Sequence, residues 1–460
     1  MKKNKIIKDI VFIVMVLAFT SSFIVSRGIG DLDEIWNYNI SNNFANGLVP
    51  YRDYNTLVTP LLQILAGIIL KIFPNELLTM RILAVILISG ILFLIYKILG
   101  LLKVNYAVKV FSIIGIMFLE KEYFCIDYNF FALFLTLIIM YLELKHLLND
   151  NENKKDYKYN LLVGVIAGLV IMTKQTIGLL VSTATVGYMF IFILINKYKY
   201  KKEIKQDFKN LLFRILGITL PVFVFIVYLL CTNSLSYFID YAILGVKTFS
   251  NKIEYKNLLQ SEEIIIRLLA IFVPVSFIIN FIIYAKYKNK NIFIINCLSI
   301  ALFVVAFPIS DNIHFLIGST SAFIAIIYNL NKILKTIYKR INEKNDKLLF
   351  IKFFIEGVSE CLVVSALLSG IYTNYTNIKD VEYYSSLKHY KYIPIPRYYE
   401  EELKKVEEYI QNSDKKVYIL NFDAALYMIP IDRYNKDYDM FLKGNIGSKG
   451  EERTNRENKK

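Results

Sequence analysis

The sequence predicts an all-α, polytopic membrane protein, and three observations support this fold class. Of its 460 residues, 55% are hydrophobic and only 20% are charged, and the mean hydropathy is +0.44. This composition is too apolar for an ordinary soluble domain. The apolar residues form recurrent blocks of roughly 15 to 25 residues, about the length that a helix needs to cross a bilayer. Lysine-rich clusters separate the blocks.

The basic excess of 54 Lys and Arg over 39 Asp and Glu is a second guide to function. Lysines in short clusters between apolar blocks report membrane orientation, so we expect membrane lipids as partners and no nucleic acid. The four cysteines show no CxxC or histidine-flanked spacing, so neither a metal site nor a disulfide framework is predicted. A bridge between Cys125 and Cys231 stays open as an alternative.

About eleven transmembrane helices are expected. The first follows the basic segment MKKNKIIK, and it is expected to stay uncleaved because no small-x-small cleavage site follows. The spans are placed at residues 9–26, 78–97, 104–119, 130–147, 159–173, 177–195, 211–230, 264–285, 292–307, 315–330 and 348–372.

The apolar block 57–73 decides the topology. It is apolar enough to cross, but it opens with Thr59-Pro60, and Pro74 follows it closely. If it lies in the outer interface, all later lysine clusters fall on the side of the basic N-terminus, as the positive-inside rule requires. If it crossed, they would all face outward. We therefore predict an interfacial helix in the first outer loop, a cytoplasmic N-terminus and an extracytoplasmic C-terminus.

Residues 373–460 are predicted to form an extracytoplasmic domain next to a transmembrane domain of residues 1–372. Within it, EEELKKVEEYI and DAALYMI have helical patterns, whereas VYIL has the pattern of a strand. A small C-terminal α/β appendage is therefore expected. Its last segment, GSKGEERTNRENKK, is predicted to be disordered.

Acidic residues follow the outer end of the first span. Asp31, Asp33 and Glu34 are held close to the membrane surface, where a carboxylate could act as a general base. The simpler alternative is that they are solvated residues flanking a span. Asp31-Leu32-Asp33 is also a DxD, which binds a metal-diphosphate in nucleotide-sugar enzymes. Three residues are a weak motif and nothing nearby is Rossmann-like, so no metal and no cofactor are predicted.

Several short motifs follow one another on the predicted outer side. They are Asp33-Glu34, GLVPYRD at 47–53, Thr59-Pro60-Leu61, Arg81, Asp127-Tyr128-Asn129, Thr173-Lys174-Gln175-Thr176, the Pro-x-x-Asp-x-x-His turn at 308–314, and Gly444-Asn445-Ile446-Gly447. Their order resembles that of the GT-C membrane glycosyltransferases, in particular bacterial relatives of the protein O-mannosyltransferases and the aminoarabinose lipid A transferase. The resemblance covers the whole order of spans. Two departures are Thr59-Pro60 in place of the commoner Pro-Pro and a shorter outer domain.

The resemblance implies a cell-envelope enzyme that transfers a sugar from a polyprenyl-phosphate-linked donor to an extracytoplasmic acceptor, inverting the anomeric carbon by direct displacement. The acceptor is a glycolipid, a surface polysaccharide or a protein. Because such a donor arrives activated and in the membrane, the enzyme needs no nucleotide-binding domain. It needs a base for the acceptor hydroxyl, cations for the departing phosphate and a lipid groove.

The resemblance also suggests roles for individual residues. Asp33 matches the family's first-loop carboxylate and is the predicted base; Glu34 is the alternative, since adjacent helical residues point about 100° apart. Lys174, Arg81 and Arg267 are predicted to bind the donor phosphate, because each lies near the outer end of a span. For the two arginines, the alternative is that they reach toward lipid headgroups.

Asp127, Asp311, His314 and Arg52 complete the candidate substrate-binding set. A lone Asp/His pair such as Asp311 and His314 is more often a hydrogen-bonded structural turn than a ligand or an acid. For Arg52, the alternative is a loop ion pair with Asp53. The competing function is a polysaccharide exporter, flippase or polymerase. A transporter should carry charges or broken helices near the bilayer midplane, whereas the notable charges here cluster toward the outer face.

Overall fold

The computed structural model describes residues 2–30, 32–148, 156–248, 252–341, 346–440, 445–450 and 452–453. Within these ranges the regular structure is helical, with isolated bridges and no β-strand. The elements are α1 Lys2–Ile24, α2 Leu32–Ala45, α3 Leu61–Ile72, α4 Leu77–Leu101, α5 Tyr106–Glu120, η1 Lys121–Tyr123, α6 Tyr128–Leu148, α7 Tyr157–Thr173, α8 Gln175–Tyr198, α9 Lys205–Cys231, α10 Leu235–Phe238, η2 Ile239–Leu244, η3 Gly245–Thr248, α11 Lys256–Leu259, α12 Ile264–Tyr287, α13 Lys290–Phe303, η4 Val304–Ala306, α14 Asn312–Ile341, α15 Asp346–Lys379, α16 Arg397–Asn412, α17 Ala424–Met428 and η6 Ile429–Ile431.

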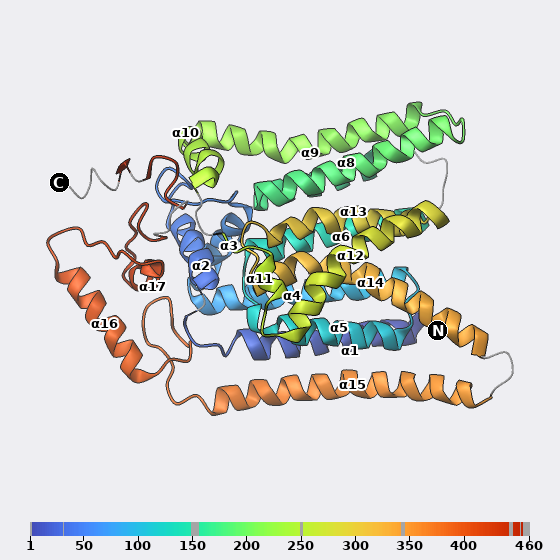
Figure 1. Ribbon diagram of the computed structural model, residues 1–460. Helices are drawn as coiled ribbons and strands as arrows, with labels where there is room; N and C mark the ends of the chain where they lie inside the picture. Colours follow the sequence, from blue (N-terminus) through green and yellow to red (C-terminus); the bar gives the residue numbers. More distant parts are fainter. Residues whose placement is uncertain are drawn as a thin grey trace.

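The long helices lie side by side, as Figure 1 shows. Eight of the described helices are long and apolar enough to cross a membrane: α1, α4, α6, α8, α9, α12, α14 and α15. The other three predicted spans form the shorter helices α5, α7 and α13. The chain is therefore a polytopic, all-α membrane protein. Each predicted span coincides with a helix, although only eight reach the length of a full crossing by themselves.

The outer helices present apolar side chains outward. On α12, Ile265, Leu268 and Phe272 are 56%, 47% and 59% exposed. Rows of this kind also follow α9 and α15, and they exceed what a soluble monomer leaves open to water. A surrounding bilayer removes that penalty, because lipid tails are as apolar as these side chains.

The block before Pro74 forms the short helix α3, which begins directly after Pro60. Its 12 residues extend about 18 Å, less than the hydrocarbon thickness of about 30 Å. One face, including Ala66, packs toward the protein, whereas Ile68 and Ile72 are exposed. The helix therefore has the length and the two-sided character expected of an interfacial helix.

The connecting segments divide between the two ends of the bundle (Figure 1). The N-terminus shares one end with the lysine clusters: Lys97 Nζ lies 2.8 Å from the carboxylate of Asp9, and Lys335 Nζ donates to the carbonyl of Lys103 at 2.7 Å. Helices α2, α3, α10, α16 and α17 gather at the other end, called here the loop-rich end. This grouping is what the lysine distribution predicts; the orientation of the bundle in a membrane stays a prediction.

A buried polar group joins four helices inside the bundle. Arg214 of α9, only 2% exposed, pairs with Glu143 of α6 at 2.7 Å. Its guanidinium also donates to Asn160 of α7 at 2.7 Å and to the hydroxyl of Tyr188 of α8 at 3.2 Å. Tyr188 in turn donates to Glu143 at 2.7 Å. Because every partner is protein, these bonds fix α9 to the rest of the bundle.

Small residues bring α7 and α9 into close contact beside this group. A Cβ on Gly164 would lie 2.2 Å from the carbonyl oxygen of Arg214, and one on Gly217 would lie 2.4 Å from that of Leu161. Glycine at both positions lets the two backbones touch, as in other membrane helix pairs.

The C-terminal region differs in part from the sequence prediction. The helices expected at 400–410 and 423–429 are confirmed as α16 and α17, and α15 continues to Lys379. The prediction of a strand at 417–420 was wrong, and the described residues form no β appendage. This segment has no partner strand. Instead, Asn435 Nδ2 donates to the carbonyl of Val417 at 2.9 Å, and the ring of Tyr418 lies 4.2 Å from that of Tyr438.

Candidate functional site

Four segments far apart in sequence meet at the loop-rich end. They are the first turn of α2 with Asp33, the start of α6 with Asp127, the turn between α7 and α8 with Lys174, and the start of α14 with His314. Each functional group follows or precedes a long apolar helix. The helix fixes how deep that group lies in the bundle. At a helix end the backbone groups lack helical hydrogen-bond partners, so polar side chains can pair with them.

Lys174 lies in the turn where α7 ends and α8 begins, and its side chain is half-buried. Its Nζ donates a hydrogen bond to Oδ1 of Asn129 at 2.8 Å and lies 5.1 Å from the ring centroid of Tyr128. Burial lowers the pKa of Lys174 to about 8, although the carboxylates of Asp127 and Asp33 raise it. The ammonium is therefore charged at neutral pH and held among groups that favour a cation.

Asp127 is 3% exposed, and its carboxylate accepts a hydrogen bond from the backbone N–H of Asn129 at 2.6 Å. Burial raises the pKa of Asp127, whereas Lys174 and His314 lower it. Asp33, Asp127, Lys174 and His314 are thus electrostatic neighbours. We call these four residues the acid–lysine cluster.

Asp311 fixes the histidine of the cluster. Nδ1 of His314 lies 2.8 Å from Oδ1 of Asp311, and the same carboxylate accepts the backbone N–H of His314 at 2.8 Å. Asp311 therefore satisfies a free N–H at the start of α14 and also orients the imidazole. No described residue hydrogen-bonds to Nε2 of His314.

Glu34 and Arg81 form a buried pair apart from the cluster. The guanidinium is 0% exposed and the carboxylate 1%, and two hydrogen bonds of 2.9 and 2.8 Å join them. Arg81 also donates to the carbonyls of Val25, Arg27 and Gly28. The pair therefore faces protein, and it anchors the start of α2, which carries Asp33.

The other two predicted arginines have separate surroundings. Arg52 forms two hydrogen bonds with Asp53, at 2.8 and 2.9 Å, and donates to the carbonyl of Thr232 at 3.1 Å. The guanidinium of Arg52 lowers the pKa of Asp53. Arg267 is exposed in the first turn of α12, and its backbone N–H donates to the carbonyl of Glu263 at 3.1 Å.

One residue that helps to build the site, Gln175, was not predicted from the sequence. The side chain of Gln175 donates to the carbonyls of Leu57 and Ala242 at 2.9 and 3.0 Å and accepts from the backbone N–H of Thr59 at 3.2 Å. The hydroxyl of Thr59 donates to the carbonyl of Ile171 at 2.6 Å. These bonds fasten the first outer stretch to the turn between α7 and α8. The only sign of this role in the sequence is that the amide of Gln175 directly follows Lys174.

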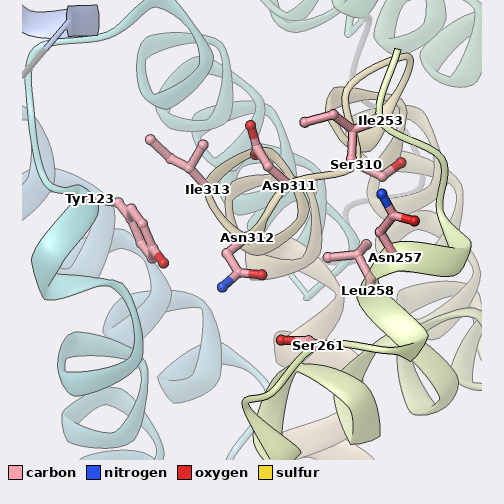
Figure 2. A pocket seen from close by; sticks show the side chains of 9 residues that line it. All are labelled: Tyr123, Ile253, Asn257, Leu258, Ser261, Ser310, Asp311, Asn312 and Ile313. Carbon is pink, nitrogen blue, oxygen red and sulfur yellow. The ribbon is translucent and has the colours of Figure 1, made fainter.

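A second missed feature is an open pocket of about 480 Å³ beside Asp311. Figure 2 shows its lining, which comes from η1, from α11 and the residues that flank it, and from the start of α14 and the residues directly before it. The lining includes Tyr123, Asn257, Ser261 and Asn312. No local sequence pattern indicates this pocket, because its walls are separated by more than one hundred residues and their residue types are common.

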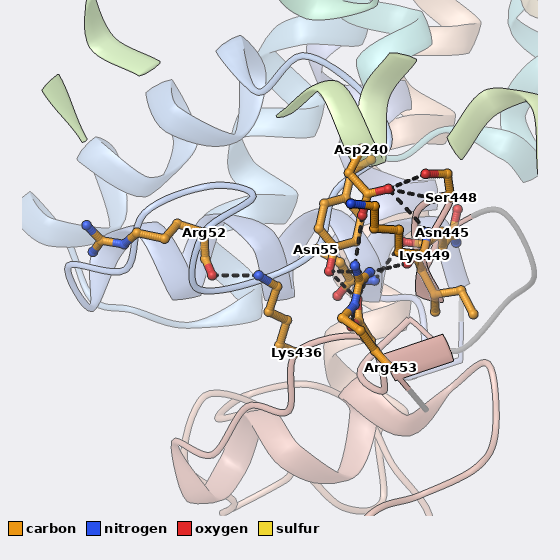
Figure 3. A network of polar contacts seen from close by, with 11 residues as sticks. Arg52, Asn55, Asp240, Lys436, Asn445, Ser448, Lys449 and Arg453 are labelled. Atoms are coloured by element: carbon orange, nitrogen blue, oxygen red, sulfur yellow. Dashed lines mark hydrogen bonds and ion pairs between the residues drawn. The ribbon is translucent and has the colours of Figure 1, made fainter. Parts of the chain in front are cut away.

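The C-terminal residues contact η2 at the loop-rich end (Figure 3). The carboxylate of Asp240 accepts from the backbone N–H of Ser448 at 3.0 Å and pairs with Arg453 at 2.8 Å. A Cβ on Gly447 would lie 2.8 Å from Oδ2 of Asp240, and its φ of +77° favours glycine. This contact explains the second glycine of the Gly-Asn-x-Gly motif; Gly444 lies outside the described residues.

Further contacts tie this tail to the first outer stretch. Lys436 Nζ donates to the carbonyl of Arg52 at 2.7 Å, and Asn55 Nδ2 donates to the carbonyl of Asn445 at 3.0 Å (Figure 3). Much of the segment 447–460 that was predicted to be disordered lies outside the described residues. Residues 447–450 and 452–453 are described and include these contacts with η2.

Within the described residues, no group of three or more His, Cys, Asp or Glu is arranged to hold a metal ion. Asp31, the first residue of the DxD, lies outside those residues. None of the four cysteines, all of which lie within the described residues, forms a disulfide, so the alternative bridge between Cys125 and Cys231 is absent there.

No family model and no curated protein matches the chain. Solved structures do. The apo oligosaccharyltransferase of Archaeoglobus fulgidus matches with a TM-score of 0.49 and 12% identity, over 94% of this chain and 64% of that one. Its complex with an inhibitory peptide and a dolichol-phosphate matches with 0.46 and 13%, over 89% and 59%.

ArnT from Cupriavidus metallidurans bound to undecaprenyl phosphate matches with a TM-score of 0.48 and 11% identity, over 80% of this chain and 72% of that one. The chain is similar to both of these structures in its fold. It spans between 56% and 64% of the length of the archaeal enzyme in the first matches.

Proposed function

We propose that the protein is an inverting membrane glycosyltransferase that transfers a sugar from a polyprenyl-phosphate-linked donor to an extracytoplasmic acceptor. The observation that supports this most is the acid–lysine cluster. It combines a half-buried ammonium, two carboxylates and an oriented imidazole at the end of a membrane bundle. A base and a phosphate-binding cation are what this reaction requires of a protein.

In the proposed reaction, Asp33 accepts the proton of the acceptor hydroxyl. The hydroxyl oxygen attacks the anomeric carbon, and the bond from that carbon to the phosphate oxygen breaks on the opposite face. The electron pair leaves with the phosphate, whose growing charge Lys174 stabilises. The products are the inverted glycoside, the carrier phosphate and a protonated Asp33.

Three other residues assist in this proposal. Asp127 favours the charged form of Lys174, and Asn129 holds the ammonium in place. Arg267, exposed near the start of α12, attracts the phosphate of the carrier lipid to the membrane surface. Arg81 and Glu34 support the site indirectly by fixing α2.

The test is incubation of the purified protein with a panel of polyprenyl-phosphate sugars and a membrane lipid extract as the acceptor source. Mass spectrometry should detect released carrier phosphate with at least one donor, and Asp33→Asn should suppress the release. Intact donor throughout the panel would reject the proposal.

The buried Arg214–Glu143 pair favours a second candidate, an exporter, flippase or polymerase, because charges inside spans often mark transport pathways. In this protein, however, the pair is bonded to Asn160 and Tyr188 and serves as a helix-to-helix connection. Proteoliposomes that move lipid-linked sugar across the bilayer without cleaving it would favour the transport function.

A further inference from the structure

The pocket beside Asp311 adjoins the acid–lysine cluster, because the carboxylate that lines it also holds His314. Its volume of about 480 Å³ falls within the range of about 300–1,000 Å³ typical of small-molecule sites. Figure 2 shows Tyr123 on one side and Asn257 on the other, with Asn312 between them. A ligand in this pocket would therefore lie next to the proposed reaction centre.

The polar groups of the lining are hydroxyls and amides. Neither the hydroxyl of Tyr123 nor the side-chain amide of Asn257 hydrogen-bonds to another described residue, so both are available to a ligand. Asn312 uses its Nδ2 on Glu263, at 3.1 Å, and keeps its carbonyl oxygen. Amides and hydroxyls both donate and accept, which matches the hydroxyl groups of a sugar. The flat ring of Tyr123 matches the apolar face of a pyranose.

The charges of the pocket have one sign. Asp311 is the only residue with a side chain charged at neutral pH among those that line it. Two lysines on neighbouring elements are each paired with a carboxylate: Lys121 with Glu122 at 3.3 Å, and Lys256 with Glu254 at 2.6 Å. An anionic ligand would find a carboxylate in the pocket and no unpaired cation in its lining, and like charges repel.

We infer that this pocket binds a sugar residue without negative charge, that Tyr123 and Asn257 contact this sugar, and that the carboxylate of Asp311 disfavours an acidic one. The inference rests on the proposed function only for the role of the sugar in the reaction. The sugar belongs either to the donor or to the end of the acceptor, since both present the same hydroxyl chemistry.

Direct binding tests the inference without turnover. Saturation-transfer NMR on the purified protein would use methyl glucoside, galactoside and mannoside as neutral probes and methyl glucuronide as the acidic probe. At least one neutral probe should bind, and the glucuronide should not. Asn257→Ala and Tyr123→Leu should each weaken binding about tenfold, the loss expected for one good contact. Tyr123→Phe should retain the part of the binding affinity that the aromatic ring provides.

Gln260→Ala is the matched control, because Gln260 is an exposed amide three residues from Asn257 and outside the lining. It should bind the neutral probe as the unchanged protein does, and all variants should elute as the same species in size-exclusion chromatography. Equal binding of glucuronide, binding of no neutral probe, or unchanged binding in folded Asn257→Ala and Tyr123→Leu would each overturn the inference.

Kinetics then separate the two sources of the sugar. If the donor sugar occupies the pocket, the two variants raise KM for the donor; if the acceptor sugar does, they raise KM for the acceptor. Transfer with both KM values unchanged would reject the inference and leave the proposed function intact. Neutral-sugar binding that the variants abolish, without transfer from any donor, would reject the proposed function and leave the inference intact.

Discussion

Asp33 and Glu34 are adjacent in sequence, yet their surroundings predict opposite consequences of mutation. Asp33→Asn should lower turnover by about 10²- to 10⁴-fold and leave stability unchanged, because the amide keeps the shape but cannot accept a proton. Glu34→Gln leaves the buried guanidinium of Arg81 without a countercharge, at a cost of about 3–5 kcal/mol. Turnover and thermal unfolding should be measured on both. A stable, inactive Glu34→Gln beside an active Asp33→Asn would transfer the base to Glu34.

Lys174 gives the reaction a predicted pH dependence. Its pKa of about 8 means that the ammonium is charged below that pH and loses its proton above it. If it stabilises the phosphate, kcat/KM should fall as the pH rises through about 8. Lys174→Arg should be slower, because guanidinium is wider, but should show no such fall, since it stays charged. Lys174→Gln should lower the maximal rate at saturating donor; weakened donor binding alone would make the residue a lipid anchor.

The sequence indicated which residues lie near the outer face but not which of them pair. Lys174 and Asn129 are joined across 45 positions, and Arg81 and Glu34 across 47. Such pairs depend on how the helices pack, which no local pattern reports. The resemblance to a family suggested Lys174 as a ligand of phosphate, yet it gave no means to foresee that Arg81 would be enclosed by carbonyls.

At the scale of elements, features that depend on nearby residues were predictable, whereas features that need a distant partner were not. Pro60 and Pro74 bound the short helix α3, and both are visible in the sequence. The short apolar run VYIL is typical of an extended segment, but a strand also needs a neighbouring strand to share its backbone hydrogen bonds. At 417–420 side chains supply the contacts, so no ladder forms.

The crossing of α7 and α9 should be sensitive to the size of one residue. Gly217→Val would place atoms within 2.4 Å of the backbone carbonyl of Leu161, which cannot move aside as a side chain can. We expect a loss of about 1–3 kcal/mol in stability, seen as a lower melting temperature in detergent. Gly187→Val in α8 is the control, because nothing lies within 4 Å of its Cβ position, and it should change stability by about 0.5 kcal/mol or less.

The contact of the tail with η2 depends on Arg453, which forms ion pairs with Asp240 and with Asp437, each at 2.8 Å. Arg453→Gln removes the charge from this network and should increase the rate of C-terminal cleavage by thermolysin several-fold, because local opening exposes the segment. Lys449→Gln, at an exposed position nearby, should be cleaved like the unchanged protein. Equal cleavage of both variants would show that other contacts hold the tail.

At the scale of the whole molecule, the spans were predictable because a bilayer imposes one strong and local requirement. Each crossing helix must be about 20 residues long and apolar, and this is legible in the sequence itself. The site was less predictable, since it forms where four helix ends converge. Helix positions along the chain define which ends share a side, but the packing of the bundle determines which of them touch.

Orientation in the membrane is the last prediction. The lysine clusters and the N-terminus share one end of the bundle, and Ser386 belongs to the segment that follows α15 at the other. Because basic loops stay cytoplasmic, Ser386→Cys should react with an impermeant maleimide on intact cells. Tyr200→Cys, exposed between α8 and α9, should react only after permeabilisation. The native cysteines are first replaced, since Cys231 and Cys361 are exposed. The reverse labelling pattern would invert the protein and move the acid–lysine cluster to the cytoplasmic side, where the proposed acceptor is not found.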